Sequence, residues 1–404
     1  MARDSLYPVS VKAGKPILGM LPTGWQKLSL EKCLNIEARK AYIQDNQEYD
    51  LVTVKRSRGG VIRREHLKGK DISVKSQFYI KEGDFLISKR QIVHGACGLV
   101  PKELSGSIVS NEYCVLTGKS GFYLPYMEFL SESLYFQQTC FHSSIGVHIE
   151  KMIFKLDSWF KWPFNIPPLS EQKRIVKILS TWDEAISVTE KLLTNSQQQK
   201  KALMQQLLTG QKRLLDENGV RFNGKWEKKL LSDVADVYQP KTISQSMMSD
   251  SGYPVYGANG VIGFYQEFNH ETEQIAVTCR GSTCGIVNWT QAKSWITGNA
   301  MVINTDNYSY VSKKFLFYTL NGSDLKYLIS GSGQPQITGN IKTHIINLPC
   351  IEEQQKIATV LSAADAEIYT LEKKLACLRD EKKALMQQLL TGKRRVKVDE
   401  AVAE

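Results

Sequence analysis

The chain has 404 residues, of which 42% are hydrophobic and 23% are charged, and its formal net charge is +11. This length predicts about two or three domains, and the composition is typical of folded globular proteins and excludes disordered and fibrous classes. No apolar run reaches the roughly 18 residues of a membrane span, and residues 1–20 lack the basic start and apolar core of a secretory signal. We therefore expect a cytoplasmic protein with no membrane partner.

Residues 1–163 form the first predicted globular region, with residues 1–20 as an N-terminal extension. Residues 83–100 have the pattern of strand, turn and strand, a short strand is expected at 113–116, and aromatic residues mark a helix at 125–136. The region carries a net charge of +7, which equals the excess within residues 51–100 alone. Such a localised basic excess indicates a polyanion as partner, although a basic face is also an ordinary route to solubility.

Residues 164–213 form the first predicted helical region. Apolar residues recur there at alternating steps of four and three, the heptad pattern of a helix that pairs with another helix. A Pro-containing turn starts the helix and Gly210 ends it, so that its roughly 38 residues span about 57 Å. The predicted seam consists of Ile175, Leu179, Trp182, Ile186, Leu193, Leu203 and Leu207.

Residues 214–345 form the second globular region, whose net charge is zero. The same succession is expected in it: strand, turn and strand over 274–287, a short strand at 300–303 and a helix at 313–318. Residues 346–392 form the second helical region, and residues 393–404 form a C-terminal tail. The seam of the second helix consists of Ile357, Leu361, Ile368, Leu371, Leu375, Leu378, Leu385 and Leu389.

The chain is an internal duplication. The eleven residues 200–210 are identical to residues 382–392, and residues 166–175 resemble residues 348–357 at the same offset of 182. The two globular regions also open alike, at Trp25 and Trp226, each of which is followed five places later by leucine. Chance does not produce eleven identities in register, so the repeat is the strongest signal in the sequence.

Two seams in one chain most economically pair with each other, and the region between them lets the helices run antiparallel. The alternative is that each seam packs on its own globular region. We expect the coiled coil, because the heptad is held for about five repeats with the polar residues 197–201 outside it. The predicted fold class is α+β: two globular α/β domains alternate with two long helices that form an antiparallel coiled coil, in a pseudo-twofold tandem repeat.

These features resemble the specificity subunits of type I restriction-modification enzymes, over almost the whole chain. The hallmarks are Pro-Pro-Leu-Ser-Glu-Gln at 167–172, Pro-Cys-Ile-Glu-Glu-Gln at 349–354, Ala-Leu-Met-Gln-Gln-Leu-Leu-Thr-Gly at both helix ends, and the Trp-x4-Leu openings. The resemblance implies two target recognition domains that each read one half of a split sequence in double-stranded DNA. It also implies that two modification subunits dock on the helices, that restriction subunits can be added, and that helix length sets the spacing of the half-sites.

The chain itself is expected to be non-catalytic. An adenine methyltransferase needs an Asn/Asp-Pro-Pro-Tyr/Phe loop for the extruded base, but the only adjacent prolines are flanked by Ile166 and Leu169. The eight cysteines and six histidines show no metal-ligand spacing, so no metal is expected. The resemblance implies that S-adenosylmethionine, ATP and magnesium belong to the partner subunits and that this chain carries no cofactor.

Candidate DNA-binding residues of the first domain lie in its basic segment. A flexible loop around Gly59 and Gly60 could place guanidinium groups against phosphates or guanine edges, and residues that follow the strand near Ser88 could also reach a groove. The alternative is a solvated hairpin. The candidates are Lys55, Arg56, Arg58, Arg63, Arg64, Lys89, Arg90 and Gln91.

The neutral second domain predicts fewer phosphate contacts and more polar readout. Arg, Asn and Gln side chains can make bidentate contacts to guanine and adenine, and the resemblance implies that turns between strands face the DNA. The alternative is that these loops are ordinary turns. The candidates are Asn259, Arg280, Ser282, Thr283, Gln334 and Gln336.

Two other classes of protein stay open at this point. One is a coiled-coil scaffold protein with protein-binding globes. The other is a self-contained nuclease or methyltransferase, which the missing motifs disfavour. Salt dependence separates DNA binding from scaffolding, because neutralisation of phosphates makes the affinity fall steeply with salt.

Overall fold

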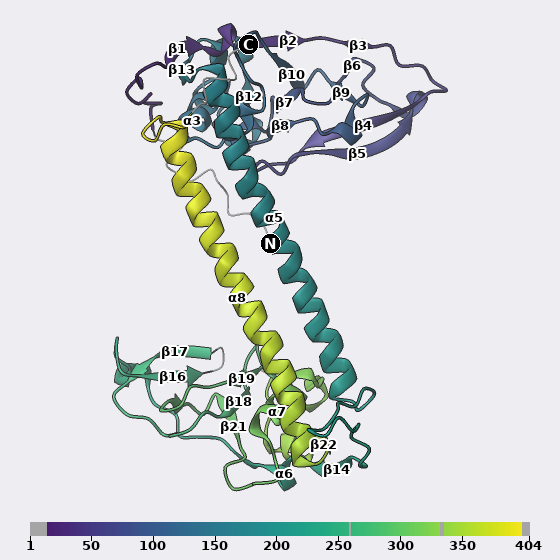
Figure 1. Ribbon diagram of the computed structural model, residues 1–404, viewed down its shortest axis with the longest axis vertical. Helices are drawn as coiled ribbons and strands as arrows, with labels where there is room; N and C mark the ends of the chain where they lie inside the picture. The colour runs from purple at the N-terminus through teal and green to yellow at the C-terminus, as the bar shows by residue number, and fades with distance from the viewer. Residues whose placement is uncertain (1–13, 258–259, 332–334, 398–404) are drawn as a thin grey trace. The chain divides into compact units, whose positions relative to one another are not determined.

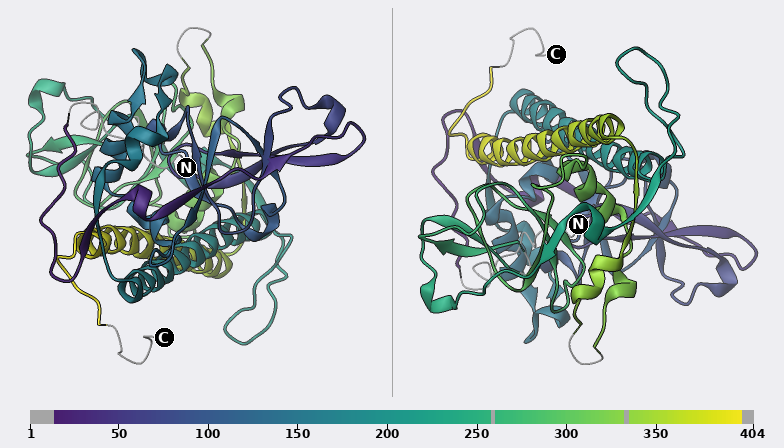
Figure 2. Two further views of the ribbon diagram at one scale, coloured as in Figure 1. Left: turned by 90° about the horizontal axis from the view of Figure 1, so that it is seen from above. Right: turned by 90° about the horizontal axis from the view of Figure 1, so that it is seen from below.

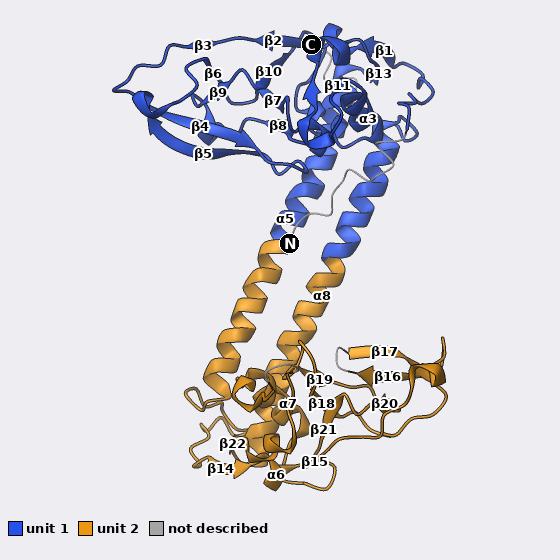
Figure 3. Cartoon of the chain, turned by 180° about the vertical axis from the view of Figure 1, so that it is seen from behind, with its two compact units in different colours: residues 1–188, 375–404 blue, residues 189–374 orange. Residues whose placement is uncertain are grey.

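The structure is a computed structural model that describes residues 14–257, 260–331 and 335–397. The chain divides into two compact units (Figure 3): the first combines residues 1–188 with residues 375–404, and the second holds residues 189–374. Each unit therefore contains one globular region and parts of both helical regions. The segment boundaries predicted from the sequence divide the chain in another way and stay predictions.

Two long helices dominate the fold, α5 at Leu169–Leu207 and α8 at Ile351–Leu390 (Figure 1). In the first unit Leu179, near the start of α5, shares a buried cluster with Leu389, near the end of α8. In the second unit Leu207, at the end of α5, shares a cluster with Leu361, near the start of α8. Within each unit the helix segments are therefore antiparallel, as was expected from the length of chain between them. No helix within the described ranges is both long and apolar enough to cross a membrane.

The predicted seam lies on the inner side of both helices. Every predicted seam residue, from Ile175 to Leu207 on α5 and from Ile357 to Leu389 on α8, is buried or half-buried, whereas Val188 on α5 is exposed. Ion pairs accompany the seam. Asp183 and Lys382 approach to 2.6 Å in the first unit, and Asp365 and Lys200 approach to 2.5 Å in the second. These two pairs correspond at the repeat offset, so the helices pair in the same register in both units.

The central sheet of the first unit has four strands in the order β2-β10-β7-β8. They are β2 (Leu34–Glu37), β7 (Phe85–Ser88), β8 (Cys97–Leu99) and β10 (Tyr113–Gly118). A second, five-stranded sheet has the order β3-β6-β9-β4-β5, with strands β3 (Lys40–Ala41), β4 (Glu48–Val54), β5 (Val61–Lys68), β6 (Gln77–Tyr79) and β9 (Ile108–Ser110). Its edge hairpin β4–β5 protrudes from the rest of this unit (Figure 2).

The central sheet of the second unit has the same topology, in the order β15-β21-β18-β19. Its strands are β15 (Asp236–Tyr238), β18 (Ile275–Thr278), β19 (Val287–Trp289) and β21 (Ala300–Asn304). A smaller sheet of three strands replaces the five-stranded one, with β16 (Tyr253–Gly257), β17 (Gly260–Tyr265) and β20 (Trp295–Ile296). The repeat seen in the sequence is therefore a structural repeat of the central sheet, and the additional sheets differ.

A pair of short strands leads into each long helix. These pairs are β1 (Gln26–Ser29) with β13 (Pro163–Ile166), and β14 (Glu227–Leu230) with β22 (Ile345–Leu348). The first unit also contains α2 (Tyr126–Leu130), α3 (Leu134–His142), α4 (Leu156–Phe160), β11 (Ser144–Ile145) and β12 (Ile153–Phe154), and the second contains α6 (Leu231–Val234) and α7 (Lys313–Gly322). The continuous helix predicted at 125–136 is wrong, because Ser133 caps a new helix by accepting a hydrogen bond from the backbone of Phe136.

A cluster of three side chains, here called the joint cluster, ties each globular region to the helices. In the first unit the indole N–H of Trp25 donates to Glu171 at 2.9 Å, and Arg395 donates to both oxygens of Glu171 at 2.8 Å. Glu171 lies in the first turn of α5, whereas Arg395 follows the end of α8. One carboxylate thus holds together a globe, the start of one helix and the end of the other.

The second unit repeats the joint cluster with equivalent residues. Trp226 donates to Glu353 at 3.2 Å, and Arg213 donates to both Glu353 oxygens at 2.6 Å. The Glu353 side chain is 1% exposed and that of Arg213 is 20% exposed. A buried carboxylate is costly unless it is paired, so this bidentate contact satisfies a charge that could not otherwise be buried.

A glutamine next to each joint carboxylate fixes the adjacent loop. Gln172 accepts from the backbone N–H of Tyr123 at 2.7 Å, and Gln354 accepts from that of Ser312 at 2.8 Å. Each also donates to a backbone carbonyl at the start of its own helix, at 2.9 and 2.8 Å. Tyr123 and Ser312 are equivalent positions, because each donates to one of these glutamines. Tyr126 and Phe315, three residues further along, are therefore equivalent as well.

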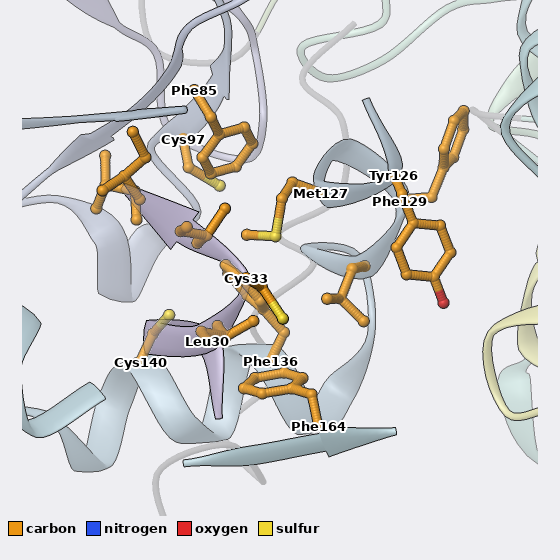
Figure 4. Close-up of a cluster of buried hydrophobic side chains, with 14 of the residues drawn as sticks. Leu30, Cys33, Phe85, Cys97, Tyr126, Met127, Phe129, Phe136, Cys140 and Phe164 are labelled. Carbon is orange, nitrogen blue, oxygen red and sulfur yellow. The ribbon is translucent and has the colours of Figure 1, made fainter. Parts of the chain in front are cut away.

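The buried hydroxyl of Tyr126 has no hydrogen-bond partner among the residues that the structure describes (Figure 4). Figure 4 shows its oxygen directed away from Met127. Burial, with a smaller contribution from Glu171, raises the pKa of Tyr126 well above its usual value. Since Phe315 occupies the corresponding place without a hydroxyl, the hydroxyl of Tyr126 is not required by this packing.

We expect Tyr126→Phe to keep or increase the free energy of unfolding, by up to about 1 kcal/mol, because it removes an unsatisfied buried polar group. Tyr318→Phe is the matched control. The Tyr318 hydroxyl donates to Asp365 at 2.6 Å, so its removal should lower the free energy of unfolding by about 1 kcal/mol. Urea denaturation of both variants measures the difference, and a clear loss of stability in Tyr126→Phe would contradict this account.

Candidate nucleic-acid interface

Each unit carries a turn at the same place in its central sheet, between β7 and β8 in the first unit and between β18 and β19 in the second. The backbone N–H of Lys89 begins the first turn by donating to the carbonyl of Glu112 at 2.9 Å. The backbone N–H of Cys279 begins the second turn by donating to the carbonyl of Asn299 at 3.1 Å. Lys89 and Cys279 are therefore equivalent positions, and so are Glu112 and Asn299.

A second loop lies beside each turn in the same manner. The backbone N–H of Phe154 donates to the carbonyl of Lys89 at 2.8 Å, and the N–H of Ile337 donates to that of Cys279 at 3.0 Å. Both units thus build the turn from the same backbone contacts, although their sequences differ there. The candidate loops after β7 and after β18 therefore occupy equivalent places in the two units.

The residue that follows this position is an arginine in both units. Arg90 and Arg280 are both exposed. Arg90 forms an ion pair with Glu112 at 2.5 Å, whereas Arg280 forms no ion pair with the residues that the structure describes. Neither arginine contributes to a core, so the equivalent site presents a cation outward in both units.

In the first unit the turn of the β4–β5 hairpin lies against the β7–β8 turn. The backbone N–H of Ser57 donates to the carbonyl of His94 at 2.7 Å, and that of Arg58 donates to Gly95 at 2.9 Å. The structure therefore brings the predicted loop around Gly59 and the predicted residues 89–91 together at one surface.

Arg56 and Gln91 meet at this surface. The Nε of Arg56 donates to Gln91 at 2.8 Å, and its Nη2 donates to Glu150 at 2.7 Å. Lys55 is exposed nearby in sequence, and the ammonium of Lys89 donates to the carbonyl of Asn111 at 2.6 Å. The contact of these side chains with DNA stays a prediction.

Arg58 is half-buried. Its three guanidinium nitrogens are buried, and its backbone is in the left-handed region with a φ of 52°. Burial raises the pKa of Cys97 to about 11, and the charge of Arg58 opposes that shift. The prediction that Arg58 contacts DNA conflicts with this burial.

Arg63 and Arg64 lie exposed on the edge strand β5. Arg63 pairs with Asp50 at 3.0 Å, and Arg64 pairs with its neighbour Glu65 at 3.3 Å. Hydrogen bonds to Asp50 and then to Glu48 raise the pKa of His66 on the same strand. The acidic residues of this hairpin offset much of its basic charge, which the count along the sequence did not show.

In the second unit the loop after β18 pairs with a neighbouring loop. Arg280 forms an isolated β-bridge with Gln336, and the backbone N–H of Gly281 donates to the carbonyl of Pro335 at 3.0 Å. Ser282 is exposed and Thr283 is half-buried. The candidates Asn259 and Gln334 lie outside the described residues.

The arrangement presents exposed arginines but offers no group of metal ligands among the described residues. Among residues 14–257, 260–331 and 335–397, no three His, Cys, Asp or Glu side chains come together so as to hold a metal ion. The thiols of Cys97 and Cys114 have a pKa of about 11 because burial disfavours the thiolate. What the two sites share is an exposed arginine on a turn held by backbone hydrogen bonds.

Comparison with known proteins agrees with this architecture. A family model described as type I restriction modification DNA specificity domain matches residues 22–195 and 223–377. The MjaVIII specificity subunit of a type I restriction enzyme from Methanocaldococcus jannaschii is 28% identical over 309 residues, which are 68% of this chain and 70% of that subunit.

Two solved structures share the fold. The HsdS subunit from Thermoanaerobacter tengcongensis has a TM-score of 0.51 at 19% identity, and the S subunit of a type I restriction-modification system from M. genitalium has a TM-score of 0.61 at 14% identity. Each comparison covers 93% of this chain and 99% of the other chain. Because the family model matches once in each repeat and covers most of the sequence, this chain belongs to the family of type I restriction-modification specificity subunits.

Proposed function

We propose that this chain reads a bipartite sequence in double-stranded DNA, one half-site through each unit, as a subunit of a cytoplasmic type I restriction-modification complex. The observation that carries the proposal is the equivalent exposed turn, with Arg90 in the first unit and Arg280 in the second. An arginine can bind a phosphate or make a bidentate contact to guanine. A duplicated reader therefore suits a target of two halves.

In this proposal the two helices dock two modification subunits and restriction subunits, and the chemistry belongs to those partners. S-adenosylmethionine, ATP and magnesium are then bound by the partners, since the chain lacks the loop that holds an extruded adenine. The purified chain alone should transfer no methyl group to DNA. Methyl transfer by the isolated chain would contradict this assignment.

The test of DNA reading is the salt dependence of duplex binding by the chain assembled with its modification partner. Removing one cation that neutralises a phosphate should reduce the slope of log affinity against log salt by about one. A coiled-coil scaffold with protein-binding globes would show no such slope. Sequencing of methylated bases in cells then gives the two half-sites.

We expect Arg56→Ala combined with Arg63→Ala to reduce the salt slope by up to about two and to weaken methylation through the first half-site only. Arg58 is left unchanged, because its burial would confuse a folding defect with a binding defect. The charge-matched control is Lys27→Ala with Lys32→Ala, on β1 and the turn after it. An equal effect in both double variants would show that only total charge matters, and altered bases in the second half-site would contradict the assignment of the first unit.

A further inference from the structure

The two equivalent turns differ at the position of Glu112. Backbone hydrogen bonds make Glu112 and Asn299 equivalent. In the first unit the carboxylate of Glu112 binds Arg90. In the second unit Asn299 carries no charge, and no carboxylate among the described residues pairs with Arg280. The duplication therefore contains one arginine with an acidic partner and one without.

Glu112 occupies one particular edge of the Arg90 guanidinium. Nε donates to one carboxylate oxygen at 2.5 Å, and Nη2 donates to the other at 3.4 Å. Nη1 makes no hydrogen bond to the residues that the structure describes. Since the guanidinium has five N–H donors in a planar fork, the terminal edge formed by Nη1 and Nη2 stays available for a second bidentate contact.

Arg56 is held through the same two guanidinium nitrogens. Its Nε donates to Gln91 and its Nη2 donates to Glu150. Two exposed arginines of the first unit are thus bound along one edge, with the remaining donors available. An unheld arginine loses side-chain entropy on binding a base, whereas a held arginine has already lost part of it.

The ion pair between Arg90 and Glu112 contributes little to the stability of the fold. The Arg90 side chain is 56% exposed and that of Glu112 is 46% exposed, and exposed ion pairs add little to stability. Near DNA, Glu112 has two opposing effects. Its charge repels phosphates and lowers affinity for any sequence, while its fixed contact orients the terminal edge of Arg90. A residue that costs general affinity and supplies orientation acts on discrimination between sequences.

We propose that Glu112 is a positioning residue for sequence recognition: it holds Arg90 so that the terminal guanidinium edge reads a guanine in the first half-site. Asn299 forms no such contact with Arg280, so the second unit discriminates less strictly at its equivalent base pair. This inference rests on the proposed function. It assigns different discrimination between base pairs to the turns of Arg90 and Arg280, which share the same backbone hydrogen bonds.

The test uses the full chain assembled with its modification subunits. Methylation rates are measured on a duplex that carries the natural target and on duplexes in which each base pair is replaced in turn. Glu112→Gln should reduce discrimination at one guanine of the first half-site by at least about fivefold, while binding to an unrelated duplex becomes tighter. Asn299→Glu should increase discrimination at one base pair of the second half-site and weaken unrelated binding.

Arg90→Lys separates charge from geometry, because lysine keeps the charge but cannot make a bidentate contact. It should reduce discrimination at the same base pair as Glu112→Gln. If Glu112→Gln tightens binding to every duplex without changing discrimination, Glu112 only sequesters Arg90 and the inference is overturned. The same holds if Arg90→Lys alters no base preference. A wild-type complex that methylates all duplexes alike would instead overturn the proposed function itself.

Discussion

Replacing Glu353 by alanine should destabilise the second unit by about 3 kcal/mol, or about 100-fold in its opening equilibrium. The side chain is 1% exposed and binds Arg213 through both oxygens and Trp226 through one. Its removal leaves a largely buried guanidinium and an indole N–H without their acceptor, which costs more than the pair itself contributes. Hydrogen–deuterium exchange of the purified chain measures this opening, with peptides of the first unit as internal reference.

Glu353→Gln is the near-isosteric control. The amide oxygen can still accept from Trp226, but the charge that neutralises Arg213 is gone, so an intermediate destabilisation is expected. Glu171→Ala in the first unit should cost less, because the Arg395 side chain is 42% exposed and water screens its charge. If exchange accelerates equally in both units, or if Glu353→Ala leaves it unchanged, the joint cluster does not hold the second globe to the helices.

The helices were predictable because a single periodic signal specifies them. Each seam position, such as Leu179 or Leu361, repeats the same requirement for burial. A single position that departs from the pattern therefore does not change the prediction of a helix. Identity over eleven residues showed that both helices belong to one internal duplication. The central strands were predictable for a similar reason, since their turns and apolar runs occur twice.

The joint clusters could not be predicted, although their signal was present. Glu171 and Glu353, like Arg213 and Arg395, are separated by the repeat offset of 182. In each cluster the carboxylate nevertheless binds residues more than a hundred positions away in the sequence, and periodicity carries no information on such contacts. The clue in the sequence was that these glutamates and arginines repeat at the offset of 182 although they lie outside the seam, where helix pairing does not require them.

Contact of the candidate residues with DNA stays a prediction, and the structure shows which of them are exposed. The basic count placed Arg56 and Arg58 together, yet one is exposed and the other has its guanidinium buried. Neighbouring residues of a turn face different directions, so composition alone cannot separate them. The equivalence of Arg90 and Arg280 was also hidden, because the turns share backbone hydrogen bonds and almost no sequence.

We expect that lengthening both helices by four residues lengthens the unread spacer between the half-sites by one or two base pairs and leaves the half-sites unchanged. Four residues add about 6 Å and rotate the helix end by about 40°. DNA advances about 3.4 Å per base pair and turns once in about ten base pairs. The expected shift follows from these lengths and from the proposed reading of one half-site by each unit.

The pairing of the two helices requires that both be lengthened at matching positions. An insertion after Thr194 in α5 alone would leave four residues without partners on α8, because Asp365 pairs with Lys200 and Asp183 pairs with Lys382 in one register. The matching position on α8 is after Thr370. The double insertion should therefore be active with a longer spacer, and the insertion in α5 alone should be less stable. Seven residues in each helix preserve the heptad and should disturb packing least while they demand a still longer spacer. Methylation mapping in cells decides: an active double variant with an unchanged spacer, or with altered half-site bases, means that the helices do not set the spacing.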